Sequence, residues 1–318
     1  MSNIPVITTN LKPNSLGANQ RLAEAITRLA SKQTYYTIHF LADRDLMADA
    51  YRAYAYFRWV DDQIDQSGME KRERLIFVEK QKSLIDQCYR GEWPRHLSDE
   101  ESMLVELIHS KHGKRSGLQS YIRNMMAVMS FDAERRGRLI CEAELNQYTH
   151  SLAVAVTEAM HYFIGHGSRS PQGQTRYQAV TAAHITHMLR DTLDDAEAGY
   201  FNIPREVVES QRIDPRDAHS EPYRNWIKSR VALARACFKS GRGYLAQVEN
   251  ARCRAAGFAY AARFERVLSA IEQDEYRLRS AYPECKSLAS AAWMGWSAIS
   301  QAFNSHRPGN LLPVQPTR

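Results

Sequence analysis

Apolar residues recur with a helical period along most of the chain. Between about residues 20 and 303, hydrophobic positions return every three to four residues, with polar and charged positions between them. The stretch 44–66 contains no Gly or Pro and predicts a helix about 34 Å long. No hairpin dipeptide joins two alternating apolar runs, so the pattern gives no support for strands. The sequence therefore predicts an all-α protein.

The same pattern places further helices, separated by Gly- and Pro-containing breaks. Ser98, followed three residues later by Glu101, has the spacing of a helix-starting capping box. Pro-containing segments at both ends indicate disorder over 1–18 and 304–318, which leaves one helical domain over 19–303. The other predicted helices are 70–90, 118–135, 141–164, 175–197, 221–246, 255–282 and 287–303.

Composition narrows the class of protein. The chain has 318 residues, of which 44% are hydrophobic and 25% charged, so it can bury a core. The net charge of +6 is dispersed without a basic block, which argues against a nucleic-acid partner. The five cysteines form no CxxC pair, and no signal peptide or long apolar span is present. We expect a cytoplasmic protein. The uncharged, Trp-bearing segment 287–303 is predicted to cap the core of the bundle, and the alternative is a peripheral contact with a membrane surface.

Two acidic stripes carry the candidate chemistry. Asp61 and Asp65 are four residues apart near the end of one predicted helix, and Asp191 and Asp195 repeat this spacing on another. The same helix faces also carry Tyr54 and Arg58, and His184 and His187, respectively. Two carboxylates about 6 Å apart repel by roughly 3 kcal/mol at an effective dielectric constant of 20. Oxygen ligands of this kind suit Mg²⁺ or Mn²⁺, and Mg²⁺ leaves coordination positions for phosphate oxygens. The pattern predicts two facing stripes that bind a metal-complexed diphosphate.

Four segments resemble the squalene/phytoene synthase family of head-to-head prenyl transferases. YAYFRWVDDQID (54–65) is similar to the first aspartate motif of that family, and HITHMLRDTLDDAEAGYFNIPREVV (184–208) is similar to the second. QYTHSLAVAVTEAM (147–160) resembles the helix that lines the substrate tunnel, and KQTYY (32–36) resembles a diphosphate-contacting segment. The resemblance spans about residues 30–282.

The resemblance implies a single-domain helical isoprenoid synthase fold around a central apolar cavity, with Mg²⁺ ions, or Mn²⁺, between the two motifs. The implied metal ligands are Asp61, Asp62, Asp65, His187, Asp191 and Asp195. The implied substrate contacts are Lys32, Thr34, Arg58 and Arg190, with Tyr54 and Tyr148 at the reacting centre and Ala153 and Val156 in the tunnel. Members of the family condense two prenyl diphosphates, of C15 or C20 length, through a cyclopropyl diphosphate.

Several positions depart from the family pattern. His184 and His187 replace the usual Gln and Asn, and the loop 197–202 lacks the usual basic residues. Phe264 replaces a Tyr, and Ala281 replaces an Arg. We expect the basic run 135–138 to be a solvated loop.

These departures keep two other functions open. One is a terpene cyclase or another enzyme that ionises a single prenyl diphosphate, and the other is a catalytically inactive scaffold or assembly factor. The need for NADPH and the choice between monomer and homodimer are also left open by the sequence.

Overall fold

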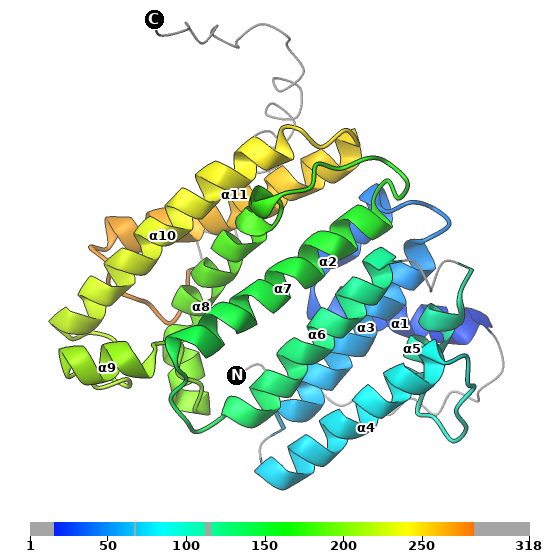
Figure 1. Cartoon of the computed structure of the whole chain (residues 1–318), viewed down its shortest axis with the longest axis horizontal. Helices are drawn as coiled ribbons and strands as arrows, with labels where there is room; N and C mark the ends of the chain where they lie inside the picture. The colour runs from blue at the N-terminus through cyan, green and yellow to red at the C-terminus, as the bar shows by residue number, and fades with distance from the viewer. Residues whose placement is uncertain (1–15, 67, 112–115, 283–318) are drawn as a thin grey trace, which may run out of the picture.

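The helical prediction is confirmed. The computed structural model describes residues 16–66, 68–111 and 116–282, and within these ranges it contains helices and no strand. The long helices lie side by side in one bundle (Figure 1). None of the described helices combines the length and apolarity needed to cross a membrane.

The helix bounds follow the predicted ranges closely, with two exceptions. The predicted range 175–197 begins with a 3₁₀ turn, η1 (Gln174–Tyr177). The helix predicted over 255–282 is α11 (Ala251–Gln273), which ends before residue 282 because Glu275 and Tyr276 adopt positive φ values of 54° and 64°. The range 287–303 lies outside the described residues. The other helices are α1 (Leu16–Ala30), α2 (Lys32–Leu41), α3 (Met47–Ile64), α4 (Lys71–Tyr89), α5 (Asp99–His109), α6 (Ser116–Arg135), α7 (Glu142–Phe163), α8 (Gln178–Ala198), α9 (Arg205–Gln211) and α10 (Glu221–Leu245).

Local signals set two of the helix ends. The backbone N–H of Glu101 donates to Ser98 Oγ at 3.1 Å, and the Ser98 N–H donates to Glu101 Oε2 at 3.0 Å, which confirms the predicted capping box of α5. Gly199 ends α8 at φ 87° and accepts a hydrogen bond from the Gly137 N–H at 2.8 Å. The end of α8 is thereby held beside the turn that follows α6.

Helix packing positions the two acidic stripes. The buried face of α3 includes Tyr51, Tyr56 and Val60, and α8 packs against α7, α10 and α11. Both α3 and α8 end on the same side of the bundle (Figure 1). The last turns of these two helices carry the acids.

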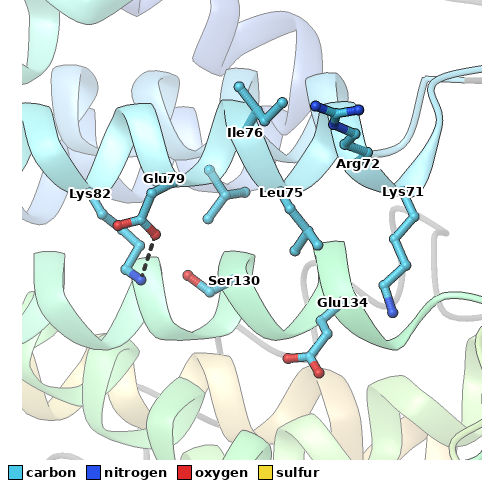
Figure 2. Close-up of a pocket in the computed structure, with 9 residues that line it drawn as sticks. Lys71, Arg72, Leu75, Ile76, Glu79, Lys82, Ser130 and Glu134 are labelled. Atoms are coloured by element: carbon cyan, nitrogen blue, oxygen red, sulfur yellow. Dashed lines mark hydrogen bonds and ion pairs between the residues drawn. The ribbon is translucent and has the colours of Figure 1, made fainter.

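A surface hollow of about 730 Å³ lies on another part of the molecule, between α4 and α6. Figure 2 shows its lining, which includes Leu75 and Ile76 from α4 and Ser130 and Glu134 from α6. The aspartates of the two stripes are not among its lining residues. This hollow is therefore separate from the candidate active site.

Candidate active site

The first acidic stripe occupies the end of α3. Arg58 donates to both oxygens of Asp62, at 3.2 and 2.5 Å, and its Nη1 lies 3.4 Å from Asp61 Oδ2. Asp61 keeps 38% of its side-chain surface accessible, whereas Asp65, the C-cap of the helix, is exposed. Since Arg58 pairs mainly with Asp62, Asp61 and Asp65 remain the accessible carboxylates of this stripe.

The second acidic stripe occupies the end of α8. Arg190 donates to both oxygens of Asp191 at 2.6 Å, and His187 Nε2 lies 3.1 Å from Asp191 Oδ2. Asp195, one turn later, accepts a hydrogen bond from the Asn202 amide at 2.7 Å. Asp194, which lies off this stripe, is exposed.

The loop after α8 connects the two stripes. The Tyr200 hydroxyl donates to Asp65 Oδ1 at 3.1 Å, and Asn202, two residues later, donates to Asp195. The backbone N–H of Tyr200 also donates to the Asp195 carbonyl at 2.7 Å. One short loop thus contacts an acid from each stripe, which places the end of α3 beside the end of α8.

A buried ion pair that the sequence analysis missed lies between the stripes. Arg135 Nε donates to Asp132 Oδ1 at 2.6 Å, and the Tyr148 hydroxyl donates to Asp132 Oδ2 at 3.0 Å. Arg135 also donates to Asn202 Oδ1 at 2.8 Å, and its guanidinium lies 4.8 and 4.9 Å from the ring centres of Tyr148 and Tyr200. The spacing of three residues between Asp132 and Arg135 on a helix was the available signal.

The prediction of a solvated loop at 135–138 was therefore wrong for Arg135. This residue is the last of α6 and is only 5% exposed. Its guanidinium is buried because aromatic rings and a carboxylate surround it. Arg135 thus places a cation close to the second stripe, although the loop 197–202 carries no basic residue.

The electrostatics of the acids reflect their crowding. Burial, and then the charge of Asp65, raise the pKa of Asp61 to about 7. Burial, and then the charge of Asp191, likewise raise the pKa of Asp195 to about 7, although Arg135 opposes this shift. Asp191 differs because the hydrogen bonds from Arg190, together with His187, outweigh burial and lower its pKa. The negative charges of Asp61 and Asp195 are thus poorly compensated by the cations of the protein alone.

The predicted phosphate contacts lie at the start of α2. Ser31 caps α2 by accepting from the Thr34 N–H at 3.2 Å, and the Thr34 hydroxyl donates to Ser31 Oγ at 2.9 Å. The phenol of Tyr54 interacts with both hydroxyl groups and lies close enough to Arg58 and Asp61 for their charges to affect its pKa. Lys32 is exposed at the first position of α2. The structure therefore brings Thr34 and Tyr54 to the first stripe.

The two histidines of α8 have different surroundings. His184 is buried, its ring centre lies 5.0 Å from that of Tyr148, and neither ring nitrogen has a hydrogen-bond partner among the described residues. Burial lowers the pKa of His184, so the imidazole is neutral at pH 7. His187 keeps half of its side-chain surface accessible and contacts Asp191. Of the two histidines, His187 is the one placed to contact an ion that is bound by the acids.

The predicted tunnel residues lie on α7. Ala153 is fully buried, whereas Val156 and Tyr148 are partly buried. Tyr148 alone of these three is connected to the acids, through Asp132. The placement of Ala153 and Val156 against a substrate remains a prediction.

The carboxylates of the two stripes are the candidate ligands for divalent cations. Within residues 16–66, 68–111 and 116–282, no three His, Cys, Asp or Glu side chains converge on a point that could hold one ion. Mg²⁺ in phosphate-binding sites typically takes only one or two carboxylates, with water and phosphate oxygens as its other ligands. Asp61, Asp65, Asp191 and Asp195 present accessible oxygens in this arrangement. The residues therefore fit Mg²⁺ bound together with a diphosphate.

Comparison with known proteins assigns the family. The sequence pattern of the family described as squalene/phytoene synthase matches residues 27–287. The chain belongs to the squalene/phytoene synthase family. No curated protein matches this family member at the level of sequence.

Solved structures agree with this family at the level of the fold. The squalene synthase HpnC from Alicyclobacillus acidocaldarius is 18% identical, with a TM-score of 0.64 over 84% of this chain and 98% of that chain. A dehydrosqualene synthase in complex with a ligand is 14% identical, with a TM-score of 0.71 over 91% of this chain and 98% of that chain. TcSQS in complex with BPH1237 is 13% identical, with a TM-score of 0.67 over 91% of this chain and 90% of that chain. This squalene/phytoene synthase family member therefore has the helical isoprenoid synthase fold.

Proposed function

We propose that the protein is a Mg²⁺-dependent prenyl transferase that condenses two prenyl diphosphates head to head through a cyclopropyl diphosphate. The loop that contacts both stripes, through Tyr200 to Asp65 and through Asn202 to Asp195, is the observation that carries the proposal. It supports a single acidic site shared by α3 and α8. The family assignment supports a prenyl transferase as the class of enzyme.

The first step is ionisation of an allylic diphosphate. Breaking the C–O bond leaves both electrons on the departing pyrophosphate, whose negative charge must be stabilised. Divalent cations, when bound, supply that stabilisation at the phosphate oxygens. The carboxylates of Asp61, Asp65, Asp191 and Asp195 would hold the cations, with His187 as an additional nitrogen ligand. Arg58, Arg190 and Thr34 would then bind and orient the diphosphate.

The second step requires a carbocation that is protected from water. Tyr148 and the buried Ala153 both lie on α7, and the hydroxyl of Tyr148 is hydrogen-bonded to Asp132 beside the acids. An aromatic face stabilises a nearby cation, and an apolar lining excludes water. The double bond of a second prenyl chain would attack the cation, and the loss of a proton would close the cyclopropane ring.

A single-substrate enzyme is the second candidate, because the loop 197–202 carries no basic residue to hold a second diphosphate. Incubation with farnesyl or geranylgeranyl diphosphate and Mg²⁺, followed by mass spectrometry of products and measurement of released pyrophosphate, separates the candidates. We expect C30 or C40 products, or their cyclopropyl diphosphates. Products of C15 or C20 would favour the single-substrate reaction, and the absence of pyrophosphate release with both substrates would favour an inactive scaffold.

NADPH use is tested in the same assay. Addition of NADPH should change the product only if a cation formed from the cyclopropyl diphosphate is quenched by hydride. Parallel reactions with and without NADPH, analysed for a mass difference of two hydrogens, decide this point.

A further inference from the structure

Arg263 is a cation of α11 that the family pattern does not assign. It is partly buried, and its guanidinium lies 5.4 Å from the ring centre of its neighbour Phe264. Among the described residues it has no hydrogen bond or ion pair. A guanidinium that loses water without gaining an acceptor is costly, so its position calls for a ligand.

The surroundings of Arg263 place it at the second stripe. The ring of Phe264 lies 6.3 Å from that of His187, whose Nε2 lies 3.1 Å from Asp191. The charges of Arg190 and Asp191 are close enough to affect the pKa of Arg263. Helix α11 also packs against α8. Arg263 therefore lies near the acids of α8, on a helix that packs against α8.

The first stripe lies close to the same guanidinium. Tyr54 of α3 is among the groups whose charge affects Arg263, and Tyr54 in turn interacts with Thr34 at the start of α2. Helix α11 contacts α2. Arg263 thus lies within electrostatic range of Asp191 on α8 and of Tyr54 on α3, on a helix that also contacts α2.

The local charge balance favours an anion at this point. Arg190 already donates to both oxygens of Asp191. This carboxylate is therefore not available to Arg263 alone. Burial, and then the neighbouring charge of Arg190, lower the pKa of Arg263. Arg263 therefore has no acceptor of its own among the described residues, although a second guanidinium lies near it. A ligand with several oxygens would supply an acceptor to Arg263.

We propose that Arg263 binds the diphosphate group of a prenyl diphosphate, from the α11 side of the site. The inference rests on the proposed function for the identity of the ligand and adds a substrate-binding residue to it. The planar fork of Arg263 can donate two parallel hydrogen bonds to phosphate oxygens. Arg263 thereby supplies a cation at the C-terminal side of the site, whereas Ala281, where an Arg is common in similar sequences, is exposed beyond the end of α11.

Three variants test the assignment. Arg263→Met removes the charge and retains much of the aliphatic stem, and Arg263→Lys retains the charge but removes the fork. Arg277→Met serves as the control. It removes the same charge from a side chain that is 62% exposed and lies 3.9 Å from Glu275. The probe is inorganic pyrophosphate with Mg²⁺, and binding is measured by calorimetry and by the ligand-induced rise in melting temperature.

We expect Arg263→Met to weaken pyrophosphate binding by about tenfold to a hundredfold, and Arg263→Lys to weaken it less. Without pyrophosphate, Arg263→Met should melt at or above the wild-type temperature, because it removes an uncompensated cation. A merely structural arginine would instead lower the ligand-free melting temperature. Arg277→Met should bind like the wild type.

The outcomes separate this inference from the proposed function. If the wild type binds pyrophosphate and releases it from prenyl diphosphates, but Arg263→Met binds equally well, the inference is wrong and the proposed function stands. If the wild type binds pyrophosphate through Arg263 but forms no prenyl product, the inference stands and the proposed function fails. If the wild type does not bind pyrophosphate, Arg263 has no such role.

Discussion

Asp191 and Asp194 lie on the same helix but face different surroundings. Asp191 is bound by Arg190 and His187 inside the site, whereas Asp194 is exposed. We expect Asp191→Ala to reduce pyrophosphate release by at least about a thousandfold, because a cation-binding carboxylate stabilises the leaving group. Asp61→Ala should have a similar effect. Release of pyrophosphate from a prenyl diphosphate is the measurement.

Asp194→Ala provides the matched control, since it removes the same group from the same helix. Its activity should stay within about twofold of wild type, and far-UV circular dichroism should show the same helical content in all three variants. Normal activity of Asp191→Ala would contradict a role of the second stripe in metal binding.

Arg135 supports an argument about stability rather than ligand binding. Its removal leaves Asp132, which is otherwise paired with it at 2.6 Å, as an uncompensated buried carboxylate. Arg135→Met should lower the free energy of unfolding by about 3–5 kcal/mol. The double variant Arg135→Met/Asp132→Asn should recover part of this loss, because the stranded charge is absent. Urea denaturation of the two single variants and the double variant measures the coupling, and strictly additive losses would contradict it.

Some site residues could be predicted from the sequence because their signal is local. Asp61 and Asp65, and likewise Asp191 and Asp195, share a helix face by spacing alone. Asn202 and Arg263 gave no such signal, because their roles depend on how a loop and α11 meet α8. The sequence correctly indicated that the loop 197–202 carries no basic residue. It could not show that Arg135 places a guanidinium near the second stripe, because that depends on the packing of α6.

At the scale of the element, two glycines of α10 have opposite surroundings. A Cβ at Gly241 would lie 2.4 Å from the backbone nitrogen of Ala179 in α8, whereas a Cβ at Gly243 would meet nothing within 4 Å. Gly241→Ala should destabilise the protein by about 1–3 kcal/mol, because α10 must move away from the helix that carries Asp191. Gly243→Ala should stabilise it by about 0.5–1 kcal/mol, because Ala favours a helix. Thermal unfolding of both variants compares the two effects, and equal shifts would contradict the proposed close contact.

Periodicity predicted most helices but not this kind of contact. The same apolar pattern that places 221–246 in a helix gives no information on which glycine meets a neighbour. The end of α11 was also missed, because the positive φ values at Glu275 and Tyr276 are not encoded by glycines. Helix existence is therefore a local property of this chain, whereas helix contacts and this helix end are set by the rest of the fold.

At the scale of the whole molecule, the acids connect stability to pH. The pKa values of Asp61 and Asp195 are raised to about 7 in the folded chain, from an ordinary value of 3.8. The folded protein therefore holds more protons than the unfolded chain between these values, and its stability falls as pH rises through 7. His161, His184 and His187 act in the opposite sense, because burial lowers their pKa values below 6.5 and the unfolded chain still loses protons from these side chains just above pH 6.5.

The difference between the wild type and a variant without these two acids therefore isolates their contribution between pH 6.5 and 8. Without divalent cations, the free energy of unfolding of the wild type should fall across this window by on the order of 1 kcal/mol relative to the double variant Asp61→Asn/Asp195→Asn. With Mg²⁺ the fall should be smaller or absent, because the cation binds the ionised carboxylates of the folded chain. The double variant itself should show little dependence on Mg²⁺. Denaturation at several pH values, with Mg²⁺ or with a chelator, measures the three profiles. A wild-type profile that is unaffected by Mg²⁺ would mean that the site does not bind the cation without a diphosphate, and the same series with inorganic pyrophosphate added would then show whether the two bind only together.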